Sequence, residues 1–227
     1  MKRWAGMAKA FTRIGREISI AVKDGGPNPD YNPRLRMAIQ NAKAANMPKS
    51  NVENAIKKAS EKDAANYDEV VYEGYGPHGV AVLVETATDN PTRTVANVRH
   101  AFSKGGGSLG TNGSVDYMFE RVGQFKVKDE GQDLEELELE LIDAGLEEIT
   151  KDEDGNLVFQ CGFTDFGNFS QALEEKGITA ESSELVRIPQ HTKSLSDDEA
   201  EDVIKMIDRL EEDDDVVNVF HTMDEGE

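Results

Sequence analysis

Apolar residues recur every three or four positions at the start of the chain. Between residues 4 and 23 they form one stripe, made of Met7, Phe11, Ile14, Ile18 and Val22. A stripe with this period is typical of a helix that buries one face. Gly25 and Gly26 follow the stripe, and glycine commonly ends a helix. The pattern therefore predicts a helix over residues 4–23.

Two shorter helices are predicted between residues 33 and 60. Asn32 can cap a helix, and Pro33 after it suits the first helical position. Pro48 ends this helix, and Ser50 and Glu53 then have the capping-box spacing that predicts the start of another. Together with the first helix, these segments predict a small helical domain over residues 1–66.

Alternating β-rich runs replace the helical pattern after Tyr67. The runs EVVYEGYG and GVAVLVETA read as strands, a helix follows Asn90, and SVDYMFER reads as a further strand. Residues 123–188 then show the order strand, helix, strand, strand, helix, strand, which is the ferredoxin-like arrangement. Beyond them, Ser196 is expected to cap a last helix, and VVNVFHTM forms a final strand.

The C-terminal helix and strand cannot cover their own apolar faces, so they are expected to complete the sheet that begins at residue 67. We therefore predict an α/β (α+β) fold in which a ferredoxin-like domain, residues 123–188, is inserted into a second α/β domain. That second domain comprises residues 67–122 and 189–227. The helical domain precedes both.

Charge is distributed unevenly along the chain, whose net charge is −20. Residues 1–62 carry 13 basic and 5 acidic side chains, a net of +8, and the rest of the chain carries −28. Residues 33–60 contain six Lys or Arg and only one acid, Glu53. This asymmetry indicates a segment that faces nucleic acid, although a solvated helical surface would look the same.

No motif in the sequence argues for an enzyme, a metal or a cofactor. GGGSLG at 105–110 matches a dinucleotide-binding pattern in letters, but a helix precedes it and a strand follows, which is the reverse of what that site needs. Cys161 lies in an apolar strand, where a buried thiol is expected. The four histidines lack ligand spacing, and EEDDD at 211–215 lacks the spacing of a calcium loop. No apolar run approaches the roughly 20 residues of a membrane helix.

Two long segments of the sequence resemble the YebC/PmpR family of probable transcriptional regulators. They contain NPRLR, NMPK, YEGYGPHGVA and TDNPTRT, and the resemblance covers essentially the whole chain. It implies an N-terminal helical domain and two α/β domains, one inserted in the other. Family members are described as DNA-binding regulators, a mitochondrial relative activates translation of a cytochrome oxidase subunit, and bacterial relatives are linked to stalled ribosomes. Relatives usually carry a longer basic N-terminal segment, in which part of the affinity for nucleic acid is expected to lie.

We predict a cytoplasmic, non-enzymatic regulator that binds DNA through the basic helical segment. The sequence does not indicate an oligomeric state, and a monomer is the default. A translation factor that touches ribosomal RNA is the alternative, because no helix carries clear base-reading chemistry. A protein-interaction scaffold is a third reading. The phosphate contacts are expected among Lys9, Arg13, Arg16, Arg34, Arg36, Lys43, Lys49, Lys57 and Lys58.

Overall fold

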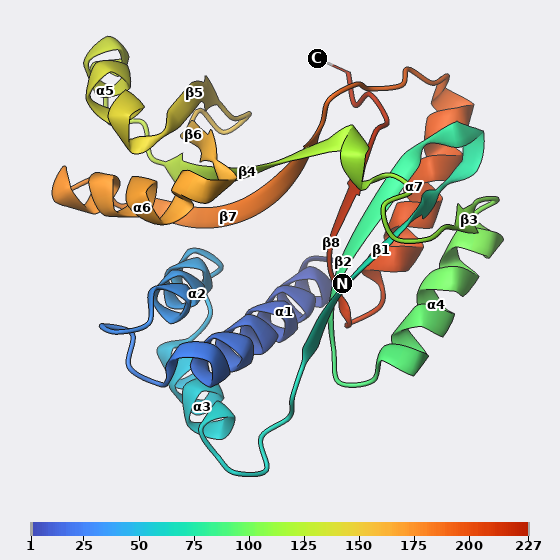
Figure 1. Cartoon of the computed structure of the whole chain (residues 1–227), viewed down its shortest axis with the longest axis horizontal. Helices are drawn as coiled ribbons and strands as arrows, with labels where there is room; N and C mark the ends of the chain where they lie inside the picture. Colours follow the sequence, from blue (N-terminus) through green and yellow to red (C-terminus); the bar gives the residue numbers. More distant parts are fainter. Residues whose placement is uncertain (1, 227) are drawn as a thin grey trace. The chain divides into compact units, whose positions relative to one another are not determined.

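The computed structural model describes residues 2–226, with side chains from Met7 onward (Figure 1). The chain forms two compact units. The first unit consists of Met1–Ile20, Lys62–Glu120 and Ile188–Glu227, and the second unit consists of Ala21–Glu61 and Arg121–Arg187. Each unit is described separately below.

The three N-terminal helices form close to where the sequence predicts them. They are α1 (Lys2–Gly25), α2 (Pro33–Ala44) and α3 (Lys49–Ala59). The cap predicted for α2 is confirmed, because Leu35 N donates to Asn32 Oδ1 at 3.0 Å. The capping box predicted at Ser50 is wrong. Helix α3 begins earlier, at Lys49, because the carbonyl of Pro48 already accepts hydrogen bonds from Asn51 N and Val52 N.

The second unit contains a four-stranded antiparallel sheet with the order β5-β6-β4-β7. Its strands are β4 (Phe119–Val127), β5 (Leu146–Lys151), β6 (Leu157–Gly162) and β7 (Ala180–Pro189). Helices α5 (Leu134–Leu141) and α6 (Phe166–Glu175) complete the β-α-β-β-α-β order, so the ferredoxin-like fold is confirmed. Phe125, Phe159 and Phe169 fill its core, with the Phe125 and Phe169 ring centroids 5.1 Å apart.

The structure corrects one strand boundary. The sequence predicts separate strands on either side of Val122 and Gly123, but both lie inside the single strand β4. Gly123 is present because Phe166 and Cys161 approach its backbone so closely that a Cβ would overlap them. A glycine inside a strand often marks such an approach, and here it does not interrupt the strand.

Helix α2 packs on the edge of this sheet. The amide of Asn41 binds one residue of β7 twice, since Asn41 Nδ2 donates to Ser183 O and Ser183 N donates to Asn41 Oδ1, both at 3.0 Å. Met37 packs against the core of the same sheet. Asn41 thus satisfies backbone groups that an edge strand would otherwise leave unpaired.

Replacing Asn41 with alanine should lower the free energy of unfolding by about 1–3 kcal/mol, because the backbone N–H and C=O of Ser183 lose their partner. Urea denaturation followed by circular dichroism would measure the change. Asn54 on α3 is exposed and is the matched control, so Asn54→Ala should change stability by less than about 0.5 kcal/mol. Equal effects of the two variants would show that the Asn41 contacts do not stabilise the fold.

The first unit contains a second four-stranded antiparallel sheet, in the order β3-β1-β2-β8. Its strands are β1 (Asp68–Tyr75), β2 (Ala81–Thr88), β3 (Ser108–Leu109) and β8 (Val216–His221). Helices α4 (Pro91–Lys104) and α7 (Asp197–Glu211) pack against one face of this sheet (Figure 1). The core between them includes Val82, Phe102 and Met206. The predicted N-caps Asn90 and Ser196 are both confirmed, by bonds from Arg93 N and Glu199 N.

The glycines of GGGSLG have a packing role. A Cβ on Gly107 would overlap the carbonyl oxygen of Tyr75, and a Cβ on Gly105 would overlap Met206. On β1 itself, a Cβ on Gly74 would overlap the carbonyl oxygen of Ser108 in the neighbouring strand β3. These glycines therefore let the loop after α4 lie directly on β1, which accounts for the motif without a bound nucleotide.

The predicted three-domain division differs from the two compact units. Helices α2 and α3 belong to the same unit as the ferredoxin-like sheet, whereas the first 20 residues belong to the unit with the other sheet. Contacts such as those of Asn41 explain why α2 groups with residues that lie far from it in the sequence. The division into residues 1–66, 67–122 with 189–227, and 123–188 stays a prediction.

Candidate nucleic-acid interface

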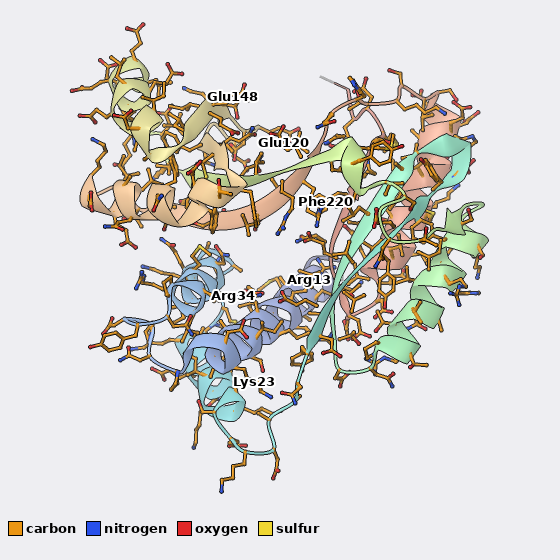
Figure 2. The ribbon with its side chains drawn as sticks, in the orientation of Figure 1. Arg13, Lys23, Arg34, Glu120, Glu148 and Phe220 are labelled. Atoms are coloured by element: carbon orange, nitrogen blue, oxygen red, sulfur yellow. The ribbon has the colours of Figure 1, made fainter. Side chains whose placement is uncertain are left out.

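Helix α2 presents two arginines and a lysine from the predicted set. Arg34 forms an ion pair with Asp24 at 3.0 Å, and Figure 2 labels it in the helical part of the second unit. Arg36 is exposed, and its Nη1 donates to Pro29 O at 3.1 Å while its Nε lies 3.8 Å from Glu174. Lys43 is exposed and has no side-chain partner among the described residues. The three cations thus differ in how far they are already engaged.

Helix α3 contacts α2 and adds three lysines. The side chain of Lys49 is 89% exposed and lies 3.7 Å from Glu53, one helical turn away. Lys57 and Lys58 are exposed in the last turn, and neither has a side-chain partner among the described residues. We call the cations of these two helices the α2–α3 cationic surface; Arg34 is half-buried and the others are exposed. Its members are Arg34, Arg36, Lys43, Lys49, Lys57 and Lys58.

The three cations of α1 have a different environment, inside the first unit. Lys9 Nζ and Arg13 Nη2 both donate to the carbonyl oxygen of Glu211, at 3.2 and 3.3 Å. That carbonyl is the last of helix α7, and cations at this position also interact favourably with the helix dipole. Lys9 and Arg13 are therefore partly engaged within the protein.

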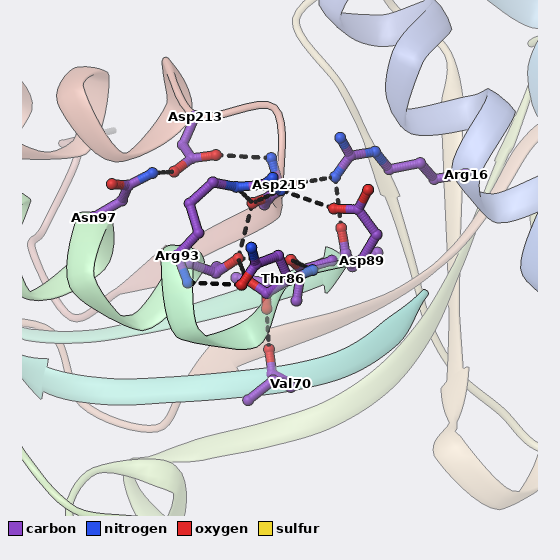
Figure 3. Close-up of polar contacts among 12 residues, drawn as sticks. Arg16, Val70, Thr86, Asp89, Arg93, Asn97, Asp213 and Asp215 are labelled. Carbon is purple, nitrogen blue, oxygen red and sulfur yellow. Dashed lines mark hydrogen bonds and ion pairs between the residues drawn. The ribbon is translucent and has the colours of Figure 1, made fainter. Parts of the chain in front are cut away.

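Arg16 is engaged much more deeply. Its Nη1 lies 2.6 Å from Asp215 Oδ1 and donates to Ala87 O at 2.6 Å (Figure 3). Its side chain is 14% exposed and that of Asp215 is 2% exposed. The guanidinium also lies over the ring of Tyr67, 5.2 Å from the centroid. Arg16 therefore has a structural role, and we leave it out of the proposed phosphate contacts.

Asp215 is the centre of this polar network. Arg93 Nη2 lies 2.8 Å from Asp215 Oδ2, and Thr94 Oγ1 lies 2.8 Å from the same oxygen (Figure 3). Burial by itself would raise the pKa of Asp215, but the hydrogen bonds from Arg93, Arg16 and Thr94 outweigh it and lower the pKa below the ordinary 3.8. Asp215 is thus held as a carboxylate that fastens α1 and α4 to the start of β8.

The asparagine side chains near these cations also differ in whether the protein already binds them. Asn41 is occupied by β7, as described above, and cannot donate to a ligand without breaking those bonds. Asn51 and Asn54 on α3 are exposed. They lie among the lysines of the α2–α3 cationic surface and can donate to phosphate or to a base edge.

An exposed aromatic residue next to this surface was missed in the sequence. Tyr31 lies in the loop between α1 and α2 and is 85% exposed. The loop sequence PNPDYN indicates turns, but it does not show whether the tyrosine packs against its neighbours. Only its exposure in the folded chain marks it as a candidate contact.

Cys161 and the histidines have the chemistry of a nucleophile, a base or a metal ligand. Cys161 is fully buried, as predicted, and burial raises the pKa of its thiol to about 12, so it is a thiol at neutral pH. Among the described residues, no group of three or more His, Cys, Asp or Glu could hold a metal ion. His78 Nε2 lies 3.0 Å from Asp202, and both are at the surface of the first unit.

None of the helices described between residues 2 and 226 is long and apolar enough to span a bilayer.

The comparisons with known proteins cover both parts of the chain. Residues 1–62 match the N-terminal domain of the TACO1/YebC protein, and residues 67–223 match the second and third domain of TACO1/YebC. The chain belongs to the TACO1/YebC family. The resemblance found in the sequence is thereby confirmed.

Relatives within the TACO1/YebC family are similar over nearly their whole length. A protein of Flavobacterium johnsoniae is 58% identical, covering 99% of this chain and 94% of the relative. One of Porphyromonas gingivalis is 53% identical, covering 100% and 94%. Both are named probable transcriptional regulatory protein, which describes a regulator and not an enzyme. The crystal structure of a conserved hypothetical protein from Aquifex aeolicus has a TM-score of 0.83 and 41% identity, covering 96% of this chain and 90% of that one.

Proposed function

We propose that this protein is a cytoplasmic regulator that binds nucleic acid through the α2–α3 cationic surface, without enzymatic activity of its own. DNA is the first target, in keeping with the names of its relatives. The observation that carries the proposal is the concentration of available positive charge. Among the residues that the structure describes, Lys43, Lys57 and Lys58 have no side-chain partner, although the chain as a whole has a net charge of −20. Lysines left exposed in this way suit phosphate contacts, and the acidic remainder opposes indiscriminate binding to polyanions.

The test is the salt dependence of binding in a charge-reversed variant. Lys43→Glu/Lys57→Glu/Lys58→Glu should weaken binding to duplex DNA by at least about tenfold at physiological salt. Each phosphate contact contributes about 0.9 to the slope of log K against log salt, so the slope should become shallower by up to about 3. Fluorescence anisotropy titrations at several salt concentrations would measure both quantities.

The matched control reverses three exposed lysines elsewhere. Lys104→Glu/Lys128→Glu/Lys205→Glu changes the net charge equally but leaves the α2–α3 cationic surface intact. It should keep most of the affinity and the same slope. Equal losses in the two triple variants would mean that only net charge matters, and the proposal would then be wrong.

A translation factor is the second candidate, and Tyr31 favours it. Bases in duplex DNA are stacked on each other, whereas single-stranded regions of RNA expose bases that an aromatic side chain can contact. Sedimentation with ribosomes that is lost at high salt and in the triple variant would support this candidate. Binding to promoter DNA with no ribosome association would support the first.

A further inference from the structure

Tyr31 is the residue beside the α2–α3 cationic surface whose exposure the fold does not explain. It occupies the position before the N-cap of α2, where an apolar residue usually packs against the fourth helical residue as a hydrophobic staple. That fourth residue is Arg36, and Tyr31 stays 85% exposed. The usual structural reason for an aromatic at this position therefore does not apply.

The loop that carries Tyr31 is well ordered by its own hydrogen bonds. Asn32 is 3% exposed, and its Nδ2 donates to Ala21 O at 2.6 Å and to Gly26 O at 2.9 Å. Asp30 N donates to Asn28 Oδ1 at 2.9 Å, and Tyr31 N donates to Asn28 O at 3.2 Å. The connection extends to the outside of the helices in Figure 1. An aromatic side chain on such a loop loses little additional freedom when it binds.

Arg36 contacts the backbone of the loop that carries this tyrosine. Arg36 Nη1 approaches the carbonyl oxygens of Pro29 and Asp30, at 3.1 and 3.5 Å, and Asp30 is the residue before Tyr31. Arg34 follows three positions later and is about one third exposed. A flat aromatic surface next to guanidinium groups is the combination that holds a base by stacking and its phosphate by charge.

Other exposed aromatic residues lack this combination. Phe163 is 40% exposed, but the guanidinium of Arg121 already lies over its ring, 3.9 Å from the centroid. Tyr117 is 68% exposed and Tyr75 is 38% exposed, but these two side chains are hydrogen-bonded to each other. Tyr31 has no ring contact among the described residues.

We infer that Tyr31 stacks on an unpaired nucleobase while the α2–α3 cationic surface contacts the adjoining phosphates. This inference rests on the proposed function and gives the ligand as nucleic acid with an accessible, unpaired base. The unpaired base comes from single-stranded RNA or from single-stranded DNA. A fully paired duplex does not offer it.

The experiment compares Tyr31→Ala with Tyr31→Trp on labelled single-stranded RNA, single-stranded DNA and duplex DNA. Loss of one stacking contact should weaken single-strand binding roughly five- to 150-fold in Tyr31→Ala, with the salt slope unchanged. Tyr31→Trp should retain or improve affinity, because it keeps the aromatic surface. Duplex binding should be the same in all three proteins. Loss on RNA alone identifies RNA as the source of the base, and loss on both single strands shows that either serves.

The control is Tyr117→Ala, which removes an exposed tyrosine of the first unit, outside the α2–α3 cationic surface, and should leave every affinity unchanged. Wild-type single-strand binding in Tyr31→Ala would overturn the inference, and so would an equal loss on the duplex or a failure of Tyr31→Trp to bind. If one of these results is found but the triple lysine variant still loses affinity, the proposed function holds and only the role of Tyr31 is wrong. Absence of all nucleic-acid binding by the wild-type protein would overturn both.

Discussion

Asp215→Ala should lower the free energy of unfolding by about 3 kcal/mol, because it removes the acceptor of a buried polar network. The guanidinium of Arg16 and the hydroxyl of Thr94 would then lack the carboxylate to which they donate inside the first unit. A buried charge or polar group without a partner lowers the stability by far more than the intact ion pair contributes to it. Urea denaturation followed by circular dichroism would measure the loss.

The control for this variant is Asp89→Ala. Asp89 also binds Arg93, at 2.9 Å, but its side chain is 49% exposed, so its removal should change stability by no more than about 0.5 kcal/mol. Unfolding of Asp215→Ala at the wild-type urea concentration would show that the network does not hold α1 and α4.

The same site predicts a dependence on acid. The pKa of Asp215 in the folded protein lies below its ordinary value of 3.8, so its ionised form stabilises the fold. This contribution is fully present above the unfolded pKa and is lost as the pH falls through the folded pKa. The advantage of the wild type over Asp215→Asn should therefore be constant near neutral pH and shrink below about pH 4. A constant difference down to strongly acidic pH would contradict the role of the carboxylate.

Glu73→Ala should destabilise the first unit by about 2–4 kcal/mol, through the loop that follows β3. Glu73 is 5% exposed on β1, and its carboxylate accepts hydrogen bonds from three backbone N–H groups. Gly113 N and Asp116 N donate at 2.6 Å, and Val115 N donates at 3.0 Å. Removing the side chain leaves these N–H groups without their acceptor while Val115 remains buried.

Hydrogen exchange would locate this effect as well as measure it. The amides of residues 113, 115 and 116 should exchange faster in Glu73→Ala than in the wild type, before global unfolding. Glu120→Ala is the control, because Glu120 is exposed and close in sequence, and it should leave these amides unchanged. Unchanged protection in Glu73→Ala would show that the carboxylate does not order the loop.

Local signals in the sequence determined much of the secondary structure. Asn32, Asn90 and Ser196 each cap the helix that follows them, because a cap binds an N–H only two or three residues away. The order of elements in residues 123–188 was likewise sufficient for the ferredoxin-like fold, since that order permits few topologies. Such features depend on neighbours along the chain, and a single sequence contains them.

The tertiary structure decided which contacts individual glycines and polar side chains make. The predicted boundary between two strands falls at Gly123, yet this glycine lies within β4, where Phe166, more than 40 residues later, packs against its backbone. Asn41 lies within the basic segment, where its amide could donate to a ligand, yet the backbone of Ser183 occupies it. In both cases the residue that makes the contact is distant in sequence, and no local sequence pattern predicts it.

The basic segment shows the same limit at the candidate interface. The sequence by itself determined that positive charge concentrates in residues 1–62 of an acidic chain. Only the fold distinguished Arg16, which Asp215 binds from 199 positions away, from Lys43, Lys57 and Lys58, for which no described residue is a side-chain partner. Only the fold left Tyr31 exposed beside Arg36. The physical reason is that the availability of a charge or a ring depends on what packs around it, and distant parts of the chain supply that packing.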